Sequence, residues 1–447
     1  MLDNVESLQG FLDRAWEEAE TLGLRPHPVE FEVVPSTAIF ELASYGMPGH
    51  WSHWTYGRDY WQFKQRMESG HGRLYEMVVN TNPAHAYLLD SNTVAAQKLV
   101  VAHVLGHSDV FANHERFQDT PKDMDRSMAA ARERFAEYEA EYGADRLERL
   151  LDAALSLSAQ VAPDRPAEGA APAGAGAHDR YRDLFGDGDS PHPAHRRRAP
   201  YPLPTYDVLG FLARHSPVLE EWERDVLEAV RREALYFEPQ RVTKLVNEGY
   251  ATLVHNTLLS RLPIGDDEAL EAARVHAQVI APFELGMNPY RVGFQLLSYL
   301  VEQFGFARTR EIVMLETDAS LLRNWLTEEA VERLELYQYR WQRAEHRLGG
   351  QMVPTWDAVV TDAGWEAVRD DLANRYAYRG PQIVAERVDG RGRLVLRQVE
   401  DGMALDEPWA QATLDQVQRL WGAPVLLERP GGPPLESRLK EDDSDDP

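Results

Sequence analysis

Apolar residues recur at helical spacing along most of the chain. Between Val5 and Gly23 they return every three or four positions, which predicts an amphipathic helix. The run from Val94 to His107 is almost wholly apolar and follows the cap-forming residues Asp90-Ser-Asn92, so it predicts a helix buried on all sides. Charged amphipathic helices are expected from Asp123 to about Ala159.

Strand patterns are confined to the two ends of the chain. Near the N-terminus, Phe31–Val34, Tyr75–Val79 and Ala86–Leu89 are expected to be strands, and a turn at Asn80–Pro83 joins the last two. Near the C-terminus, short β-type runs alternate with two helical segments, as in a small α+β domain.

These patterns predict a mainly α protein of the α+β type, with a helical core, a short N-terminal β-sheet and a small C-terminal α+β domain. The stretch from Tyr206 to about Gly349 is expected to be almost entirely helical, with Pro239 as a break between two helices. The expected parts are an N-terminal α+β part (1–162), a flexible Ala/Gly/Pro-rich linker (163–204), a helical part that packs on the first part (205–350), a small α+β domain (351–435) and an acidic tail (436–447).

Composition limits the chemistry that is available. The 447 residues include no cysteine, so disulfides, thiolate nucleophiles and cysteine-based metal sites are excluded. Any metal ion must then be held by His, Asp and Glu. No apolar run approaches the ~20 residues of a membrane span, and the N-terminus has no signal-peptide pattern. We therefore expect a cytoplasmic protein.

The charge of the chain argues against nucleic acid as a partner. A net charge of −26 repels polyanions on average. The basic cluster Arg196–Arg198 lies inside the expected linker, where a solvated run of charge is the simpler interpretation. We expect neither a nucleic-acid partner nor a membrane span.

Two histidines in the buried helix are candidate metal ligands. His103 and His107 are four residues apart, so on a helix they lie about 40° apart around the axis and about 6 Å apart along it. Both imidazoles can then reach one metal ion. With 15 histidines in the chain, about half of one such pair is expected by chance, so the spacing needs support from its context.

A second helix offers a carboxylate for the same site. Glu248 lies in Asn247-Glu-Gly-Tyr-Ala251, and Thr252 and His255 follow on the same face. A buried, unpaired glutamate is costly, so either a metal ion or a basic neighbour such as Arg241 or Lys244 must compensate its charge.

The two motifs together resemble the metal site of the gluzincin metallopeptidases. There, a His-Glu-x-x-His helix gives two zinc ligands and Asn-Glu-Gly-aromatic-Ala gives the third, which correspond to His103, His107 and Glu248. The resemblance implies a zincin-like helical core. This chain has Val104 where those enzymes carry the glutamate that acts as general base.

Longer segments resemble the SpoVR-like (stage V sporulation protein R) family. The similar segments are Tyr75–Tyr87, Lys98–Asn113, Phe237–His255, Asn288–Gly293, Leu321–Glu329 and Leu420–Val425. They cover nearly the whole chain apart from the linker and the tail. The resemblance implies a role in sporulation or in a stress response. Because family members are typically encoded beside a serine protein kinase and a von Willebrand A-type protein, it also implies these two partners.

We expect His103, His107 and Glu248 to hold one divalent ion. These ligand types favour zinc, and iron is the alternative that two histidines and one carboxylate also permit. His255 lies about 10 Å along the helix from Glu248, so it is expected behind the ligands or as a transition-state donor. Asp109, Glu76 or the metal ion alone could activate water in place of residue 104. Asp109 could instead orient an imidazole.

Two classes of function remain open at this point. One is a metal-dependent hydrolase that acts on a peptide or peptidoglycan-like bond. The other is a non-catalytic regulatory or scaffold protein with a structural metal, which binds the partner kinase. Of the remaining histidines, His114 is expected to be an exposed helix residue, whereas His50 and His53 belong to an aromatic loop that forms either a stacking platform or a buried plug.

Overall fold

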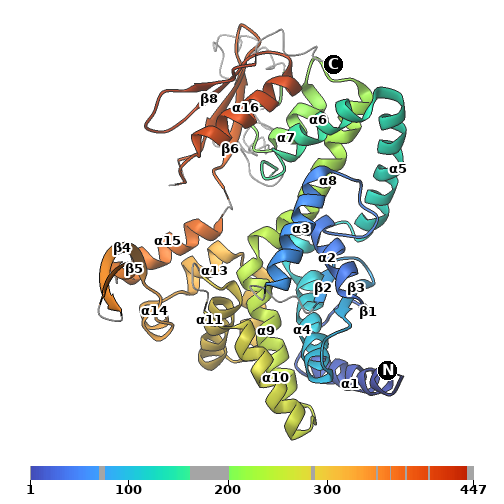
Figure 1. Ribbon diagram of the computed structural model, residues 1–447, viewed down its shortest axis with the longest axis vertical. Helices are drawn as coiled ribbons and strands as arrows, with labels where there is room; N and C mark the ends of the chain where they lie inside the picture. Colours follow the sequence, from blue (N-terminus) through green and yellow to red (C-terminus); the bar gives the residue numbers. More distant parts are fainter. Residues whose placement is uncertain are drawn as a thin grey trace, which may run out of the picture. The chain divides into compact units, whose positions relative to one another are not determined.

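The chain forms two compact units in the computed structural model, which describes residues 2–69, 76–161, 201–282, 287–348, 351–362, 364–377, 380–400 and 403–439. Unit 1 comprises residues 1–130 and 239–379, and unit 2 comprises residues 131–238 and 380–447. Helices dominate both units (Figure 1). The prediction of a mainly α protein of the α+β type is confirmed.

Unit 1 carries the two predicted motifs and most of the helices. Its described elements are α1 (Leu2–Thr21), β1 (Val29–Val34), α2 (Ser36–Tyr45), α3 (Trp54–Glu68), β2 (Glu76–Val79), β3 (Ala84–Leu89), α4 (Val94–Asn113), the 3₁₀ turn η1 (Glu115–Phe117), α9 (Lys244–Arg261), α10 (Asp266–Val279), α11 (Pro289–Phe304), α12 (Phe306–Leu315), α13 (Asp318–Trp325), α14 (Glu328–Arg333), β4 (Gln338–Leu348), β5 (Gln351–Asp362) and α15 (Trp365–Ala377). Two long helices, α5 (Met124–Tyr142) and α8 (Glu221–Val242), cross the boundary between the units.

A three-stranded sheet lies next to α4 and has the strand order β1-β3-β2. β1 is parallel to β3, and β2 is antiparallel to β3 with Glu76 opposite Leu88. Along β3, buried residues alternate with partly exposed ones, as expected for a strand with one face on the core. The sheet therefore holds Glu76, the first residue of β2, close to the helix that follows it.

The core of unit 1 forms around α4, which is buried from Ala95 to Phe111 apart from Lys98. The helix begins at a cap in which the Thr93 hydroxyl accepts a hydrogen bond from the Ala96 amide. α9 packs along α4, and α11 packs on α9, so α9 is the central layer of the three (Figure 1). A helix surrounded in this way must be apolar on all faces, which explains the unbroken apolar run in the sequence.

A side chain from a distant helix holds the start of α9. The Asp318 carboxylate accepts hydrogen bonds from the Leu245 and Val246 amides, both 2.9 Å long. Asp318 is fully buried, so it supplies the negative charge that a helix N-terminus favours without competition from water. This contact fixes the helical turn that carries Asn247 and Glu248.

Unit 2 combines helices with a four-stranded sheet. Its other described elements are α6 (Ala144–Leu155), α7 (Val208–His215), β6 (Ile383–Val388), β7 (Leu394–Gln398), α16 (Glu407–Trp421), β8 (Val425–Glu428) and β9 (Leu435–Glu436). The strand order is β6-β7-β8-β9, with β7 and β8 parallel and the other pairs antiparallel. α16 crosses between the parallel strands β7 and β8, as such a pair requires.

Two expectations about single elements are wrong. Residues 338–348, expected in a helical stretch, form β4 and pair with β5 in an antiparallel hairpin. The signal for it is the Gly349-Gly350 pair, which lies between a run with two aromatic residues and a run rich in β-branched residues. Pro239 lies inside the last turns of α8 and does not end the helix. It costs that helix one backbone hydrogen bond.

Several expectations fall outside the described residues or stay predictions. The expected linker, residues 163–204, falls mostly outside the described part of the chain, which omits residues 162–200. The Arg196–Arg198 cluster and residues 440–447 of the expected tail also lie outside it. The domain boundaries and the zincin-like character of the core stay predictions. Among the helices described, none is both long enough and apolar enough to cross a membrane.

Candidate metal centre

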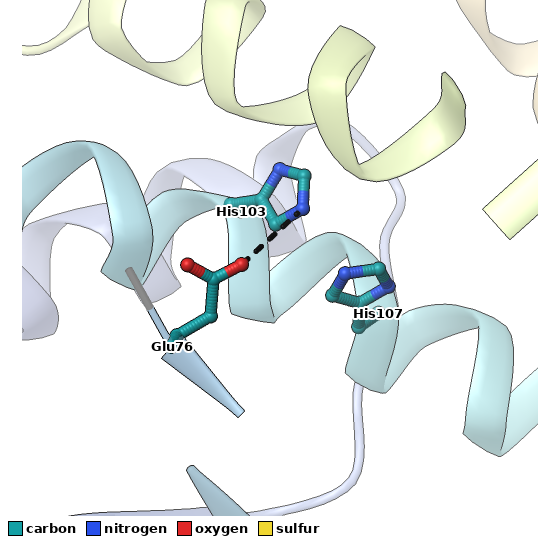
Figure 2. A group of neighbouring side chains, drawn as sticks. All are labelled: Glu76, His103 and His107. Atoms are coloured by element: carbon teal, nitrogen blue, oxygen red, sulfur yellow. Dashed lines mark ion pairs between the residues drawn. The ribbon is translucent and has the colours of Figure 1, made fainter. Parts of the chain in front are cut away.

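The two motif histidines turn their imidazoles toward one point. His103 and His107 are both buried, and their ring centroids are 4.6 Å apart. Figure 2 shows them on successive turns of α4 with Glu76 of β2 facing them. Each of the three residues offers a ligand atom, and these atoms all lie within 4.8 Å of one another. Glu76 was expected from the sequence only as a base that leans over the helix.

Glu248 brings a second carboxylate to the same point from α9. Its Oε2 atom lies 3.7 Å from His103 Nε2 and 3.5 Å from His107 Nε2. Its Oε1 atom pairs with the Lys244 ammonium at 3.0 Å, one turn earlier in the helix. The basic neighbour expected as an alternative to a metal ion is therefore present, but it occupies one oxygen and leaves the other toward the imidazoles.

Glycines in the motifs allow the helices to approach closely enough for these contacts. A Cβ atom on Gly106, between the two histidines, would lie 2.7 Å from the Ala251 Cα atom of α9. A Cβ atom on Gly249 would lie 2.5 Å from the backbone of Gly293 in α11. Such distances are impossible for real atoms, so only glycine fits at either position. The glycines of the motifs thus determine the depth at which Glu248 meets the histidines.

The other ring nitrogen of each histidine has a protein partner. His107 Nδ1 lies 3.0 Å from the Asn247 Oδ1 atom, so the imidazole donates there and carries its lone pair on Nε2. His103 Nδ1 lies 3.0 Å from His255 Nδ1. Partners of this kind orient the imidazoles of metal-binding histidines and determine their tautomers. His255 is therefore placed behind His103, on the side away from the carboxylates.

Two buried polar atoms at this point lack a hydrogen-bond partner among the described residues. They are His103 Nε2 and Glu248 Oε2. Their separation of 3.7 Å exceeds a hydrogen bond. It is close to the spacing of about 3.3 Å between neighbouring donors around a tetrahedral ion with bonds of 2.0–2.1 Å. Buried polar groups are rarely left unsatisfied, so the donor set fits a divalent cation.

Burial and charge shift the ionisation of the candidate ligands in opposite directions. Burial, and then the neighbouring His103, lower the pKa of His107 to about 4, so its imidazole is neutral and can bind a metal ion. Burial alone would raise the pKa of Glu248, but Lys244 and the two imidazoles hold it below its ordinary value. Burial, with Glu248 nearby, raises the pKa of Glu76. The site thus contains one carboxylate that is held ionised and one that binds a proton more readily.

Asp109 is not part of this group. Its carboxylate accepts two hydrogen bonds from the Arg310 guanidinium, at 2.7 and 2.8 Å, and one from the Tyr250 hydroxyl at 2.8 Å. The Arg25 amide donates a further bond of 2.7 Å. These partners occupy both oxygens, and none of them is an imidazole. The expectation that Asp109 orients a histidine or serves as the base finds no support in its contacts.

The other histidines considered from the sequence have structural surroundings. The expectation that His114 is exposed is wrong, because this residue is fully buried. It caps the C-terminal end of α4, and its Nε2 atom lies 3.0 Å from the Glu316 carbonyl oxygen. His50 and His53 are both buried, and their rings pack near Tyr56. Of the two alternatives left open for the aromatic loop, a buried plug agrees with this packing better than an exposed stacking platform.

Two residues that sequence reasoning missed lie at the centre. Burial, and then the charges of Glu248 and Glu76, raise the pKa of Tyr290 well above its ordinary value, so its hydroxyl keeps its proton. The Tyr290 ring also stacks near His103, with 6.3 Å between centroids. His276 of α10 lies 2.8 Å from His255 through Nδ1. The segment Asn288-Pro-Tyr-Arg was noted as a similarity, but its spacing indicated no chemistry.

Comparison with known proteins identifies the family. A family model described as "SpoVR like protein" matches residues 3–380, a range that includes every residue of the candidate centre. The chain belongs to the SpoVR family. A SpoVR relative from Escherichia coli (strain K12), "Uncharacterized protein YcgB", is 28% identical over 463 residues, which cover 92% of this chain and 89% of the relative. No solved structure matches the chain.

The family expectation from the sequence is thus confirmed. The gluzincin-like pattern stays a prediction, since neither the family match nor the relative tests it. Val104, the residue that departs from that pattern, is buried in the hydrophobic core of unit 1. An apolar side chain at this place packs in the core and supplies no base. For a SpoVR protein with this site, proton transfer would have to come from another residue.

Proposed function

We propose that His103, His107 and Glu248 bind a divalent metal ion and that Glu76 faces the same ion as a second carboxylate. One observation carries this proposal. His103 Nε2 and Glu248 Oε2, two buried atoms for which the described residues offer no hydrogen-bond partner, converge with the lone-pair nitrogen of His107 at ligand spacing. The donor set of nitrogen and carboxylate oxygen favours zinc, and iron is the alternative.

The chemistry that best fits this group is metal-dependent hydrolysis. A divalent ion held by these residues would act as a Lewis acid toward a carbonyl or phosphoryl oxygen. Glu76 lies 3.8 Å from His103 Nε2, and its raised pKa suits a general base that takes a proton from water. Glu76 would thereby replace the glutamate that position 104 lacks. Tyr290, which keeps its proton, can donate a hydrogen bond to negative charge that develops on the substrate.

A second candidate function is a regulatory or scaffold protein with a structural metal. The side chains of His103 and Glu248 are only 4% and 11% exposed, and the Lys244 pair satisfies part of the carboxylate. Structural sites are typically closed in this way. In this case the ion would stabilise the contact between α4 and α9, and binding of a partner would be the function.

The family resemblance supports further proposals about context. They are a role in sporulation or in a stress response, a cytoplasmic location, and a serine protein kinase and a von Willebrand A-type protein as partners. The substrate of the hydrolase candidate would be a peptide or peptidoglycan-like bond, which agrees with the sporulation role from which the family takes its name.

The first prediction concerns metal content. Protein purified without chelator is expected to contain about one zinc or iron atom per chain, because the unpartnered donor atoms need a cation. Elemental analysis by mass spectrometry measures this and identifies the metal. His103→Ala together with Glu248→Ala should remove the metal. His85→Ala, a half-buried histidine on β3 that pairs with Glu30, is the matched control and should retain it. Wild-type protein without metal, even after reconstitution, would contradict the site.

Glu76→Gln separates the two functions. The hydrolase proposal expects this variant to keep its metal and to lose most of the cleavage of a mixed peptide and peptidoglycan-fragment library, followed by mass spectrometry. The scaffold proposal expects no cleavage by either protein. It also expects a metal-ligand variant that folds normally to keep binding the partner kinase.

A further inference from the structure

Three imidazoles form a continuous hydrogen-bonded chain that begins at the candidate metal centre. His103 Nδ1 lies 3.0 Å from His255 Nδ1, and His255 Nε2 lies 2.8 Å from His276 Nδ1. The three residues come from α4, α9 and α10 respectively. His255 is fully buried, whereas His276 is only partly buried, so the chain leads from the centre toward the surface of unit 1.

Each contact between two ring nitrogens needs one hydrogen, and a neutral imidazole carries one. Burial, and then His103, lower the pKa values of both His255 and His276, which favours the neutral rings. Since His255 uses both nitrogens, a hydrogen on Nδ1 obliges Nε2 to accept from His276. A hydrogen on Nε2 obliges Nδ1 to accept from His103. The directions of the two hydrogen bonds are therefore coupled.

Only two arrangements of the neutral chain satisfy both contacts. In the outward arrangement, His103 donates to His255, which donates to His276, and His103 Nε2 carries a lone pair. In the inward arrangement, His276 donates to His255, which donates to His103, and His103 Nε2 carries the hydrogen. Both arrangements contain the same number of hydrogens, so they differ as tautomers and not in charge.

The two arrangements differ at the nitrogen that faces the carboxylates. His103 Nε2 is 3.7 Å from Glu248 Oε2 and 3.8 Å from Glu76 Oε1, too far for a hydrogen bond to either. A hydrogen on Nε2 would thus be buried without an acceptor, and it would block a cation. A lone pair on Nε2 would complete the donor set. The outward arrangement is the one that permits metal binding.

We propose that His255 and His276 are positioning residues that hold His103 in its metal-binding tautomer, with His276 as the outer acceptor that determines the direction of the chain. This inference rests on the proposed metal site. It adds a residue, His276, that acts on the candidate ligand His103 through His255. The property of His276 that matters is its ability to accept a hydrogen bond at the position of Nδ1.

Substitutions at His276 test this inference by changing what it offers to His255. His276→Asp places near the position of Nδ1 an oxygen that can only accept a hydrogen bond. This oxygen should keep His103 and His255 in the outward arrangement. His276→Ala removes the acceptor. The zinc affinity of the full chain is measured by competition with a chromophoric chelator. We expect about tenfold weaker binding for His276→Ala, the lower end of the range for residues that support ligands, and wild-type or tighter binding for His276→Asp.

A matched variant separates the hydrogen bond from the added charge. Ala273→Asp places the same charge on α10 one turn earlier, at an exposed position. It should bind zinc less tightly than His276→Asp. Nitrogen NMR of histidine-labelled, metal-free wild-type protein gives a readout that requires no variant, because it distinguishes a ring nitrogen with hydrogen from one without. We expect the hydrogen of His103 on Nδ1.

The outcomes distinguish the inference from the proposed function. If His276→Ala and His276→Asp bind zinc equally, or if the spectrum of the metal-free wild-type protein places the hydrogen of His103 on Nε2, the positioning role is wrong while the metal site stands. If wild-type protein and His103→Ala bind zinc equally, the metal site itself is wrong.

Discussion

Glu248 has different partners for its two carboxylate oxygens, and this division is the most informative feature at the scale of single residues. Lys244 pairs with Oε1, and two imidazole nitrogens lie near Oε2. An ammonium group that satisfied the whole carboxylate would leave no reason for a cation. Because Oε2 is buried and has no hydrogen-bond partner in the part of the chain that the structure describes, the ion pair and the metal site are compatible. Lys244 then orients the Glu248 carboxylate through Oε1 and leaves Oε2 as the oxygen that could bind a metal ion.

A prediction about pH follows from the buried imidazoles. Burial and His103 lower the pKa of His107 from 6.5 to about 4. Between pH 4 and pH 6.5, His107 is therefore protonated in the unfolded chain and neutral in the folded chain. The stability that the neutral ring contributes is complete above pH 6.5 and is lost as the pH falls toward 4. At pH 5, this residue alone lowers the free energy of unfolding by about 2 kcal/mol.

Urea denaturation of metal-free protein at pH 7 and pH 5 measures this loss. In His107→Gln the difference between the two pH values should shrink by about 2 kcal/mol, since glutamine does not titrate. Gly57→Ala, which changes no titrating group at an exposed position of α3, is the control and should leave the difference unchanged. An equal difference in wild type and His107→Gln would show that His107 titrates normally.

At this scale the sequence indicated the residues that meet at the candidate centre better than it indicated their surroundings. His103, His107 and Glu248 could be found because two local motifs carry them. Glu76 could be named because its strand belongs to the strand pair that precedes the histidine helix. Tyr290 and the His255–His276 contact could not be found, since they depend on how α10 and α11 pack against α9, and no local pattern encodes that packing.

At the scale of elements, close contacts between glycines hold the centre together. Gly249 of α9 faces Gly293 of α11 so closely that neither position has room for a Cβ atom. The sequence predicted α4 and α9 as helices from their apolar patterns, but the reason for their glycines appears only in the packed structure. The β4–β5 hairpin was missed because aromatic and polar residues at its start are equally compatible with a helix.

Gly249→Ala tests the importance of this contact. The added methyl group would have to lie 2.5 Å from the Gly293 backbone, so α9 and α11 must separate. We expect a loss of about 1–3 kcal/mol in the free energy of unfolding, together with weaker metal binding, because Glu248 adjoins the contact. Chemical denaturation and the chelator competition measure the two effects.

Gly57→Ala is the matched control. Gly57 lies in helix α3 at an exposed position where a Cβ atom would meet nothing within 4 Å. Alanine should stabilise that helix by up to about 1 kcal/mol. If Gly249→Ala were as harmless as Gly57→Ala, the close approach of α9 and α11 would not be needed for the centre.

At the scale of the whole molecule, unit 1 is assembled from two stretches that are far apart in the sequence. Residues 1–130 supply β2 and α4, and residues 239–379 supply α9, α10 and α11. The candidate ligands are divided between them, with Glu76 and both histidines in the first stretch and Glu248 in the second. The centre can therefore form only when the two stretches pack, and the covalent connection between them is not part of it.

Cleavage of the connecting segment tests this arrangement. A protease site inserted between Gly174 and Ala175, within the linker predicted from the sequence, would divide the ligands between two fragments. We expect the fragments to stay together in size-exclusion chromatography and to keep the metal content of the intact chain, because the packing of α4 against α9 buries apolar surface on both. Wild-type protein treated with the same protease is the control. Fragments that separate, or that lose the metal while staying together, would show that the centre depends on the connection and not on helix packing alone.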